Sequence, residues 1–487
     1  MTNFCGRDFR LEVETSFEVW EPVPGEKSSS GKITNEQVDT TSKSDVASTA
    51  YRTLSACGTR SGELTASGVT ADDSGKSLFN FLMARAMDGA AFNARSRSGS
   101  GVWYTTAVIV ASMERTGEYN GAELYSLTLA SAGTIIIDAF VFSVKTDNAG
   151  VSASNQFTLP FVASGSYSCL VQWGDGTSSH ITAWNVGTTH TYSVAGTYEI
   201  QITGLCSGWS FDGGGDAPKF LTLRHWGEIN FGDEEGALEG CVNLTIPVCD
   251  DVPNLSAMTS LGSFFSGCTS LTTIPLSAQW DTSTITMLRH LFNGCTLANP
   301  DLSGWDVSNV TNMFRTFRQS GFNNNSICNW DVSSCTSFGS TFSGNTVFNQ
   351  DLSAWDTSAA VNFQQMFFGC TAFNQDLSAW DTSSVTQTDN MFNGCTAFKK
   401  ADKLANWDIT KVTTMSGMFN GVDINDPNST ANQTNYNTVL IGWAAQTTLN
   451  NVPLNAGSSS KYTIATAGAA RTTLIGRGWT ITDGGGV

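Results

Sequence analysis

The stretch Phe348-Asn-Gln-Asp-Leu-Ser-Ala-Trp-Asp-Thr-Ser358 recurs unchanged at Phe373–Ser383, one 25-residue step later. The same step carries a ladder of Trp-Asp pairs, with a last step of 27 residues, whose tryptophans are Trp280, Trp305, Trp330, Trp355, Trp380 and Trp407. A second ladder keeps this register through Phe265, Phe292, Phe317, Phe342, Phe367, Phe392 and Phe419. A unit of this size is too small to bury its own aromatic side chains, so it must stack on its neighbours. The repeat therefore predicts a solenoid in which each unit forms one coil.

Around this repeat, the chain of 487 residues divides into four parts. We assign residues 1–133 to a first domain, 134–205 to a second, 206–425 to the solenoid and 426–487 to a C-terminal cap. Charged residues make up only 14% of the chain, while Gly, Ser, Thr and Asn are abundant, which is typical of mainly β structure with many turns. Several modest cores are expected rather than one, because single cores stop growing at roughly 250–300 residues.

The first domain shows the pattern of an antiparallel sheet or small barrel beside one helix. Apolar and charged or polar residues alternate from Phe9 to Val19, which predicts a strand with one face in water. Further alternating runs at Gly62–Val69, Val102–Val110 and Glu123–Leu129 predict more strands. Capping residues followed by apolar residues at steps of three and four predict the helix over residues 72–86.

The second domain is predicted to be strand throughout, with strands at Ile135–Val144, Gln156–Phe161, Tyr167–Trp173 and Tyr198–Ile202. The segment Trp173-Gly-Asp-Gly-Thr177 predicts a tight turn that closes a hairpin, because glycine tolerates positive φ and aspartate can bond its own backbone. In the solenoid, one short strand per coil would give seven coils a length on the order of 30 Å. The residues expected to cover its last coil are Trp443, Tyr462, Leu474, Trp479 and Ile481.

The charge balance excludes recognition of nucleic acid by a basic face. Twenty-five Lys and Arg residues stand against 43 Asp and Glu residues, a net charge of −18, whereas affinity for phosphate backbones comes from Lys and Arg. No apolar run is long enough for a membrane span, and Asp8 and Glu12 stand where a signal peptide would need an apolar core. We therefore expect a chain made in the cytosol, without membrane insertion, whose twelve cysteines are mostly reduced.

Residues 1–133 resemble the major tail, or tail tube, proteins of long-tailed bacteriophages. The resemblance rests on the sequence motifs Val38–Ser44 and Ser61–Val69, the Asp72-Asp73 pair before the predicted helix, and the predicted strand Ala122–Leu129. It implies a β-barrel or sandwich with a flanking helix. It also implies assembly into rings, typically hexamers, that stack into a conduit for DNA.

The remainder resembles BspA-like leucine-rich-repeat proteins of bacterial and protist surfaces. The repeat of that family is similar to the segment Met391–Phe398 combined with a motif such as Asp376–Asp381. Before it, Trp173–Gly176 and His190–Tyr198 resemble an immunoglobulin-like PKD domain, and the chain end at Gly478–Gly485 also matches. The resemblance implies a PKD/Ig-like β-sandwich followed by a leucine-rich-repeat solenoid.

The Trp-Asp ladder admits two interpretations. Stacked indoles suit the apolar faces of sugars, but we favour tryptophans that fill the coil interiors while each aspartate bonds turn amides. Cys268, Cys295, Cys370 and Cys395 share one repeat position and predict an interrupted internal column. A single column without histidine does not offer the four tetrahedral ligands that zinc needs.

No catalytic constellation stands out. The segment Gly75-Lys76-Ser77 is similar to the end of a phosphate-binding loop, but that motif also needs glycine at position 70, where this chain has Thr70. We therefore interpret the segment as a helix start. The four histidines, His180, His190, His225 and His290, form no hydrolase motif. His190 is expected in a strand, where packing or hydrogen bonding is its role. The sequence therefore predicts no catalytic, metal or cofactor site, and it does not specify the ligand-binding residues.

These expectations favour a non-enzymatic virion protein, a tail tube subunit assembled in the host cytoplasm. Its partners would be its own copies as ring and tube, other tail proteins, and phage DNA that passes without sequence recognition. The second and third parts would project outward and adhere weakly, but in many copies, to a host surface glycan or protein. A cell-surface adhesin of the BspA-like type is the alternative, and a polysaccharide-degrading enzyme with a carboxylate pair is a third hypothesis.

Overall fold

The computed structural model describes residues 10–16, 19–22, 28–35, 60–70, 92–98, 101–119, 122–131, 136–137, 139–249, 251–424 and 434–487. Its strands are β1 Arg10–Ser16, β2 Val19–Pro22, β3 Ser28–Asn35, β4 Arg60–Thr70, β5 Phe92–Ser98, β6 Gly101–Tyr119, β7 Ala122–Ser131, β8 Ile136–Ile137, β9 Phe140–Lys145, β10 Gln156–Thr158, β11 Phe161–Gln172, β12 Ser178–Ile181, β13 Thr189–Thr191, β14 Thr197–Trp209, β15 Phe220–His225, β16 Pro453–Gly457 and β17 Thr480–Asp483. Its helices are the 3-10 turns η2 Ala217–Lys219, η3 Ser277–Gln279, η4 Asn325–Ile327 and η5 Ala401–Asn406, and the α-helices α2 Thr434–Ala444 and α3 Ile464–Gly476. The chain is mainly β, as predicted.

The N-terminal strands form one antiparallel sheet in the order β2-β1-β5-β6-β7-β4-β3, with β8 also paired to β6. The predicted runs at Gly62–Val69, Val102–Val110 and Glu123–Leu129 lie within β4, β6 and β7. In the described part of the chain β2 and β3 are edge strands, so the sheet is open and the predicted barrel is not closed there. Alternation alone fits both outcomes, because closure depends on whether the edge strands pair.

The single strand predicted from Phe9 to Val19 is instead a hairpin. β1 and β2 pair antiparallel, with Glu14 opposite Trp20 and Glu12 opposite Pro22. Alternation does not mark where one strand ends and the next begins, so it could not distinguish one long strand from two short ones. Three of the predictions concern residues outside the described ones. They are the helix over residues 72–86, the motif Val38–Ser44 and the segment Gly75-Lys76-Ser77.

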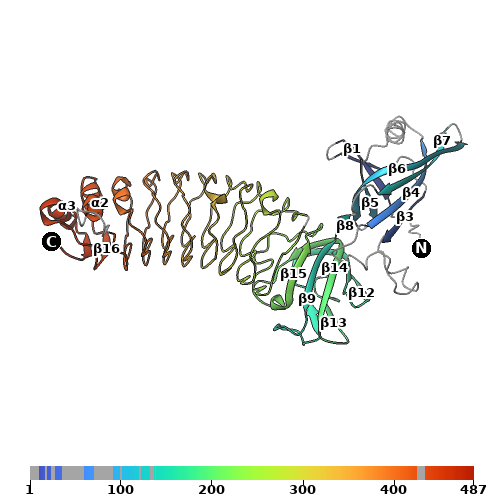
Figure 1. Ribbon diagram of the computed structural model, residues 1–487, viewed down its shortest axis with the longest axis horizontal. Helices are drawn as coiled ribbons and strands as arrows, with labels where there is room; N and C mark the ends of the chain where they lie inside the picture. Colours follow the sequence, from blue (N-terminus) through green and yellow to red (C-terminus); the bar gives the residue numbers. More distant parts are fainter. Residues whose placement is uncertain are drawn as a thin grey trace.

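The next strands form a five-stranded antiparallel sheet in the order β12-β11-β14-β9-β15, beside a two-stranded pair of β10 and β13 (Figure 1). The predicted hairpin at Trp173–Thr177 is confirmed, because β11 and β12 pair with Gln172 opposite Ser178. The sheet extends beyond residue 205: β14 runs on to Trp209, and β15 adds a strand beside β9. Its inner face is aromatic, with Phe142 and Phe220 stacked at 4.7 Å between ring centroids.

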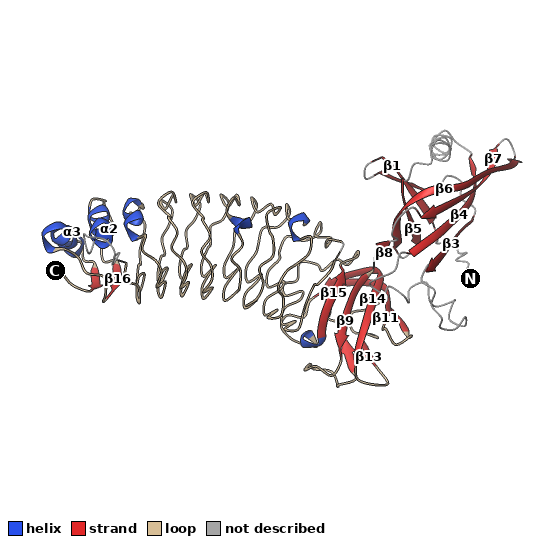
Figure 2. Cartoon of the chain, viewed as in Figure 1, coloured by secondary structure: helices blue, strands red, loops and turns tan. Residues whose placement is uncertain are grey.

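From the end of β15 onward the chain forms a row of stacked coils, here called the coil stack, residues 226–424 (Figure 1). Single parallel bridges join successive coils through Ser260, Met287, Asn312, Ser337, Asn362, Gln387 and Thr414. Most of each coil is loop and turn (Figure 2), so the short strand expected in each coil is reduced to one bridged residue. Between the bridged residue and the left-handed glycine, every second amide nevertheless donates to the next coil, as from Leu288 to Asn312 at 3.0 Å and from His290 to Phe314 at 2.9 Å.

Aromatic columns fill the interior of the coil stack. Neighbouring rings of the phenylalanine ladder lie 5.5 to 5.9 Å apart and within 11° of parallel. Among the tryptophans, Trp280 and Trp305 stack at 5.7 Å and Trp380 and Trp407 at 6.3 Å. All residues of both ladders are buried. Because each inner ring of the phenylalanine ladder contacts rings in the coils before and after it, no coil can bury its side chains alone.

One turn of each coil needs a left-handed backbone. Glycine fills this position in most coils, with φ of +75°, +76° and +69° at Gly267, Gly294 and Gly369. Successive glycines approach closely, since a Cβ on Gly294 would lie 3.8 Å from the Cα of Gly267. The exception is Gln319, which adopts φ of +52° in the same turn.

The coil-to-coil ladder continues into the C-terminal segment. Met415 forms a parallel bridge with Leu454 in β16, and its amide donates to Pro453 at 3.0 Å. The indole of Trp443 in α2 donates to the carbonyl of Leu404 at 2.9 Å. Of the residues expected to cover the last coil, Trp443, Leu474 and Trp479 are buried, and Tyr462 and Ile481 are partly buried.

Replacing Trp355 by alanine tests the interior packing of the coil stack. Its side chain is 2% exposed, and its indole donates to Ile327 at 2.9 Å, so truncation leaves a cavity and an unpaired carbonyl. We expect a loss of about 3–5 kcal/mol in the free energy of unfolding, measured by urea denaturation. The matched control Trp184→Ala, at a side chain 46% exposed, should change it by less than about 0.5 kcal/mol. Equal losses in both variants would contradict this packing.

Candidate functional site

The Trp-Asp pairs divide their two side chains between the inside and the outside of each coil. The indole nitrogens of Trp305, Trp330, Trp355, Trp380 and Trp407 each donate to a carbonyl 28 or 30 residues earlier, at 2.8 to 3.2 Å. Within the described residues the first indole, that of Trp280, has no such acceptor. Buried indoles present no face on which a sugar ring could stack.

Each aspartate of the pairs closes its own turn. Asp281 accepts hydrogen bonds from the amide of Ser283 at 3.1 Å and from its hydroxyl at 2.6 Å. The same amide contact recurs at Asp306, Asp331, Asp356, Asp381 and Asp408, at 2.8 to 3.1 Å. These hydrogen bonds occupy the carboxylates in local turn structure.

A second polar ladder runs along the stack through asparagine side chains. The side-chain oxygen of Asn299 accepts the amide of Asn323 at 2.9 Å, one coil later. Asn349, Asn374 and Lys399 continue the series, each amide bonded to the preceding asparagine at 2.8 to 3.0 Å. Sequence reasoning missed this ladder, although the Phe-Asn pair of the repeat carried its signal.

The four column cysteines lie buried inside the coils. Their thiols donate to carbonyl oxygens 28 or 30 residues earlier at 2.7 to 3.2 Å. Burial raises the pKa of Cys295 and of Cys395 to about 12, so both are uncharged thiols at neutral pH. In the part of the chain that the structure describes, no group of His, Cys, Asp and Glu side chains is arranged to hold a metal ion.

His190 lies in β13, and its environment is that of a structural residue. Its ring stacks on Trp173 at 4.7 Å, and Nε2 lies 2.8 Å from Oδ2 of Asp175 in the turn between β11 and β12. Burial raises the pKa of Asp175, but hydrogen bonds from Thr177 and His190 outweigh it and leave that pKa lowered. The contact joins β13 to the hairpin turn.

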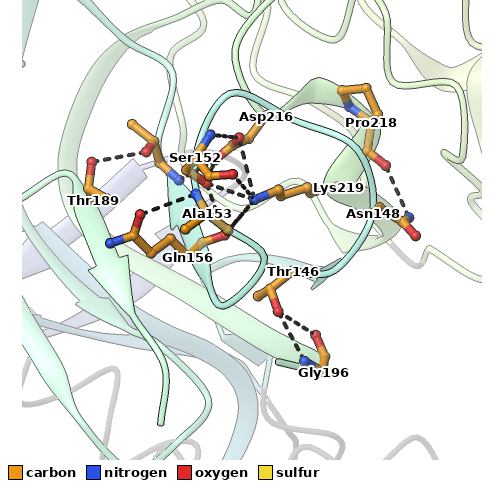
Figure 3. Close-up of polar contacts among 11 residues, drawn as sticks. Thr146, Asn148, Ser152, Ala153, Gln156, Thr189, Gly196, Asp216, Pro218 and Lys219 are labelled. Atoms are coloured by element: carbon orange, nitrogen blue, oxygen red, sulfur yellow. Dashed lines mark hydrogen bonds and ion pairs between the residues drawn. The ribbon is translucent and has the colours of Figure 1, made fainter. Parts of the chain in front are cut away.

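The most elaborate polar cluster lies where the five-stranded sheet meets the coil stack, and it surrounds Lys219 (Figure 3). The ammonium group is fully buried and donates to the carbonyls of Ser152, Ala153 and Gln156 at 2.8 to 3.0 Å. It also contacts the Ser152 hydroxyl at 2.7 Å and Oδ1 of Asp216 at 3.7 Å. A lysine can be buried in this way because every N–H has an acceptor and a carboxylate balances its charge.

Asp216 is equally well bonded. Its carboxylate accepts the amides of Ser152 at 3.0 Å and Thr158 at 2.8 Å, and the hydroxyl of Ser152 at 2.5 Å. A Cβ at Gly150 would lie 2.5 Å from Oδ1 of Asp216 and 2.6 Å from Cε of Lys219, so only glycine fits beside the pair. A cavity of about 410 Å³ opens next to Asp216, but the carboxylate that lines it is already engaged. The cluster fastens a loop to the sheet, and nothing in the sequence around Lys219 distinguished it from a surface lysine.

Comparison with known proteins finds a family-model match to each of two parts of the chain. Residues 3–136 match the family model of the phage tail tube protein. Residues 248–325 and 315–433 match a family described as Mycoplasma protein of unknown function, DUF285. None of the curated proteins compared with the chain matches it significantly.

Among solved structures, similarity is found to the virion of a native gene transfer agent particle, at 22% identity and a TM-score of 0.21, over 27% of this chain and 96% of that chain. The tail of an empty gene transfer agent particle with C6 symmetry gives 22% identity and a TM-score of 0.22 over the same shares. The Dit hub protein of phage SPP1 gives 8% identity and a TM-score of 0.16, over 40% of this chain and 98% of that chain.

The family match of the N-terminal region supports a structural protein of a phage tail. None of the described helices is both long and apolar enough to span a membrane. The more detailed PKD and BspA-like assignments are not tested by these matches and stay predictions.

Replacement of Lys219 by methionine tests the buried cluster. The change keeps the length of the side chain but leaves Asp216 as a buried carboxylate without its counterion. We expect a loss of about 3–5 kcal/mol in the free energy of unfolding of this part of the chain. The control Lys145→Met removes a 3.5 Å ion pair to Asp147 whose side chains are 45% and 44% exposed, and should cost at most about 1 kcal/mol. A small loss for Lys219→Met would show that the pair does not fasten the loop.

The aspartate turns predict how the stability of the coil stack depends on pH. Hydrogen bonds from Ser283, Ser333 and Ser383 lower the pKa of Asp281, Asp331 and Asp381. A carboxylate whose folded pKa is lowered stabilises the fold above its unfolded pKa, about 3.9 for aspartate. This stabilisation is lost as the pH falls through the lowered folded pKa. We therefore expect the temperature of the unfolding midpoint to decrease when the pH is lowered below about 4. Thermal unfolding followed by circular dichroism at several pH values measures this.

The triple variant D281N/D331N/D381N is the matched control for this pH dependence. Asparagine keeps the acceptor oxygen of each turn but does not titrate in this range. Its thermal midpoint should fall less steeply below about pH 4 than that of the unchanged chain. Identical slopes would mean that these turns do not contribute to the acid sensitivity.

Proposed function

We propose that this chain is the tail tube subunit of a long-tailed phage, a structural virion protein without enzymatic activity or cofactor. The observation that carries the proposal is the match of residues 3–136 to the phage tail tube family. Residues 1–133 would form the tail tube domain, assemble into rings, typically hexamers, and stack into a tube. Among the described residues β2 and β3 are the edges of the antiparallel sheet, and such edges offer backbone groups for pairing between neighbouring subunits.

The tube would conduct phage DNA without reading its sequence. With 25 basic against 43 acidic residues, the chain does not hold phosphate backbones tightly, so the polymer can slide past it. The protein would join other tail proteins during assembly in the host cytoplasm and reside in the virion tail.

The rest of the chain would form an outward decoration of the tube. We assign residues 134–205 to a PKD/Ig-like domain, 206–425 to a leucine-rich-repeat solenoid and 426–487 to its cap. The coil stack extends away from the N-terminal sheet along the length of the molecule, which suits a projecting arm (Figure 1). Repeated around many rings, weak contacts to a host surface glycan or protein would add up to strong adhesion.

A bacterial cell-surface adhesin of the BspA-like type is the second candidate. Its support is the pair of overlapping matches over residues 248–433, which lie mostly in the coil stack and outside the tail tube match. The two candidates differ in whether the first 133 residues assemble.

Negative-stain electron microscopy of the purified full-length protein distinguishes them. We expect rings or tubes with radial protrusions, because the N-terminal sheets associate while the coil stacks point outward. The matched control is a chain that ends at residue 133, which should give smooth tubes of smaller diameter. Monomers that persist at high concentration, even with tail-initiation proteins added, would reject the tail tube proposal and favour the adhesin.

A further inference from the structure

One coil of the stack departs from the pattern of its neighbours. Where the other coils carry Phe-x-Gly followed by cysteine, asparagine or valine, this coil reads Phe314-Arg-Thr-Phe-Arg-Gln-Ser-Gly321. Gln319 takes the glycine position at φ of +52°, where left-handed backbone is costly for a side chain other than glycine, and such positions gather at functional sites. Arg315 occupies the second left-handed position of its coil, at φ of +59°, which His290 and Ser340 fill in the neighbouring coils at φ of +58°. The departure brings two arginines to one turn of the stack.

The side chains around this turn form a compact cluster. The guanidinium of Arg315 lies over the ring of Phe314, 4.7 Å from its centroid. The ring of His290, one coil earlier, meets the ring of Phe314 at 5.6 Å and 60°. In the next coil, a Cβ on Gly339 would lie 3.0 Å from Cδ2 of Phe314, so glycine at that position leaves room for the ring. Phe314 thus contacts both an arginine, over its ring, and a histidine, in an edge contact.

Of the three arginines near Phe314, which are Arg289, Arg315 and Arg318, Arg289 is the one whose charge is balanced by a carboxylate. Arg289 donates twice to Oε2 of Glu235, at 2.9 and 2.7 Å. Arg318 donates only to neutral oxygens, those of Asn293 at 3.3 Å and Gln319 at 2.9 Å.

The guanidinium of Arg315 has no hydrogen-bond or ion-pair partner among the described residues, and its Nε atom is buried without an acceptor. A buried guanidinium N–H without an acceptor is unfavourable, and an oxyanion would satisfy it. Burial lowers the pKa of His290, and Arg315, Arg289 and Arg318 lower it further against an opposing effect of Glu235. The positive charges therefore lie close enough to act together.

The surroundings make this cluster exceptional. Residues 206–425 hold 21 acidic and 9 basic residues, so most of the coil stack repels anions. A polyanion would therefore be held at this cluster rather than along the whole stack. The planar guanidinium matches the oxygens of phosphate and carboxylate, and an aromatic ring beside it suits the apolar face of a sugar.

We infer that Phe314, Arg315, Arg318 and His290 form a binding site for an oxyanion, phosphate or carboxylate, carried by a surface polysaccharide. The site itself stands on the geometry of the coil stack. Its use in host adhesion rests on the proposed function.

Titration calorimetry of the full-length protein tests this site. The probes are poly(glycerol phosphate), polygalacturonate and, as a neutral polymer, dextran, at low salt because screening weakens exposed charges. We expect at least one anionic polymer to bind and dextran not to bind. Binding of poly(glycerol phosphate) alone would identify a phosphate, and binding of polygalacturonate alone a carboxylate.

The variant R315Q/R318N is designed from the repeat itself, since Gln365 and Asn293 occupy the equivalent positions in other coils. It should lower the association constant at least roughly tenfold, as expected when charge-assisted hydrogen bonds are lost. The control K400Q/K411Q removes the same charge elsewhere on the stack and should lower it less than about twofold. Circular dichroism checks folding, and the single variant R318N repeats the test if the double variant is unstable.

The inference is overturned if neither anionic polymer binds, if R315Q/R318N binds as tightly as the unchanged chain, or if the lysine control loses as much. These outcomes are separate from those of electron microscopy. Polymer binding by a chain that forms no tubes would keep the site and remove the tail tube proposal. Tubes whose subunits bind no polymer would support the tail tube proposal and reject the binding site.

Discussion

The main-chain ladder between successive coils is the constraint on which the rest of this structure depends. It begins at β14, where the amide of Gly208 donates to Asn230 at 2.8 Å, and it ends at β16, where Phe419 donates to Asn455 at 3.0 Å. Because the ladder fixes the register of every coil, side chains at equivalent positions fall into columns. Stacked rings, buried thiols and asparagine bonds are consequences of that register. The thiol, indole and asparagine columns also satisfy polar groups that loops would otherwise leave unpaired.

Much of this architecture could be predicted from the sequence, because a repeat fixes spacing and spacing fixes columns. The 25-residue step placed Trp355 and Phe342 in register, and both are buried in the structure. The reduction of the expected strands to single bridges was not predictable, since Thr-rich segments such as 282–286 have strand-like composition but turn at every aspartate. The antiparallel pairing of β1 with β2 was missed because alternation alone does not show where a strand ends.

Polar clusters proved harder to anticipate than apolar ones. Lys219 and Asp216 are three residues apart in sequence, but the carbonyls that surround the lysine come from residues 152–156, about 65 positions earlier. The arginine cluster likewise depends on contacts between coils, although its sequence did break the repeat at Gln319. In a repetitive chain, a position that abandons the shared residue is therefore informative even without any alignment to other proteins.

The independence of each coil has a consequence for how such a chain can change over generations. Since a coil contacts chiefly the coils on either side, a duplication or deletion of one 25-residue unit would preserve both ends and alter only the reach of the arm, by about 4.8 Å. Recombination between near-identical stretches such as Phe348–Ser358 and Phe373–Ser383 would produce these changes in frame. The repeat thus gives the lineage a way to adjust length in discrete steps while the fold is kept.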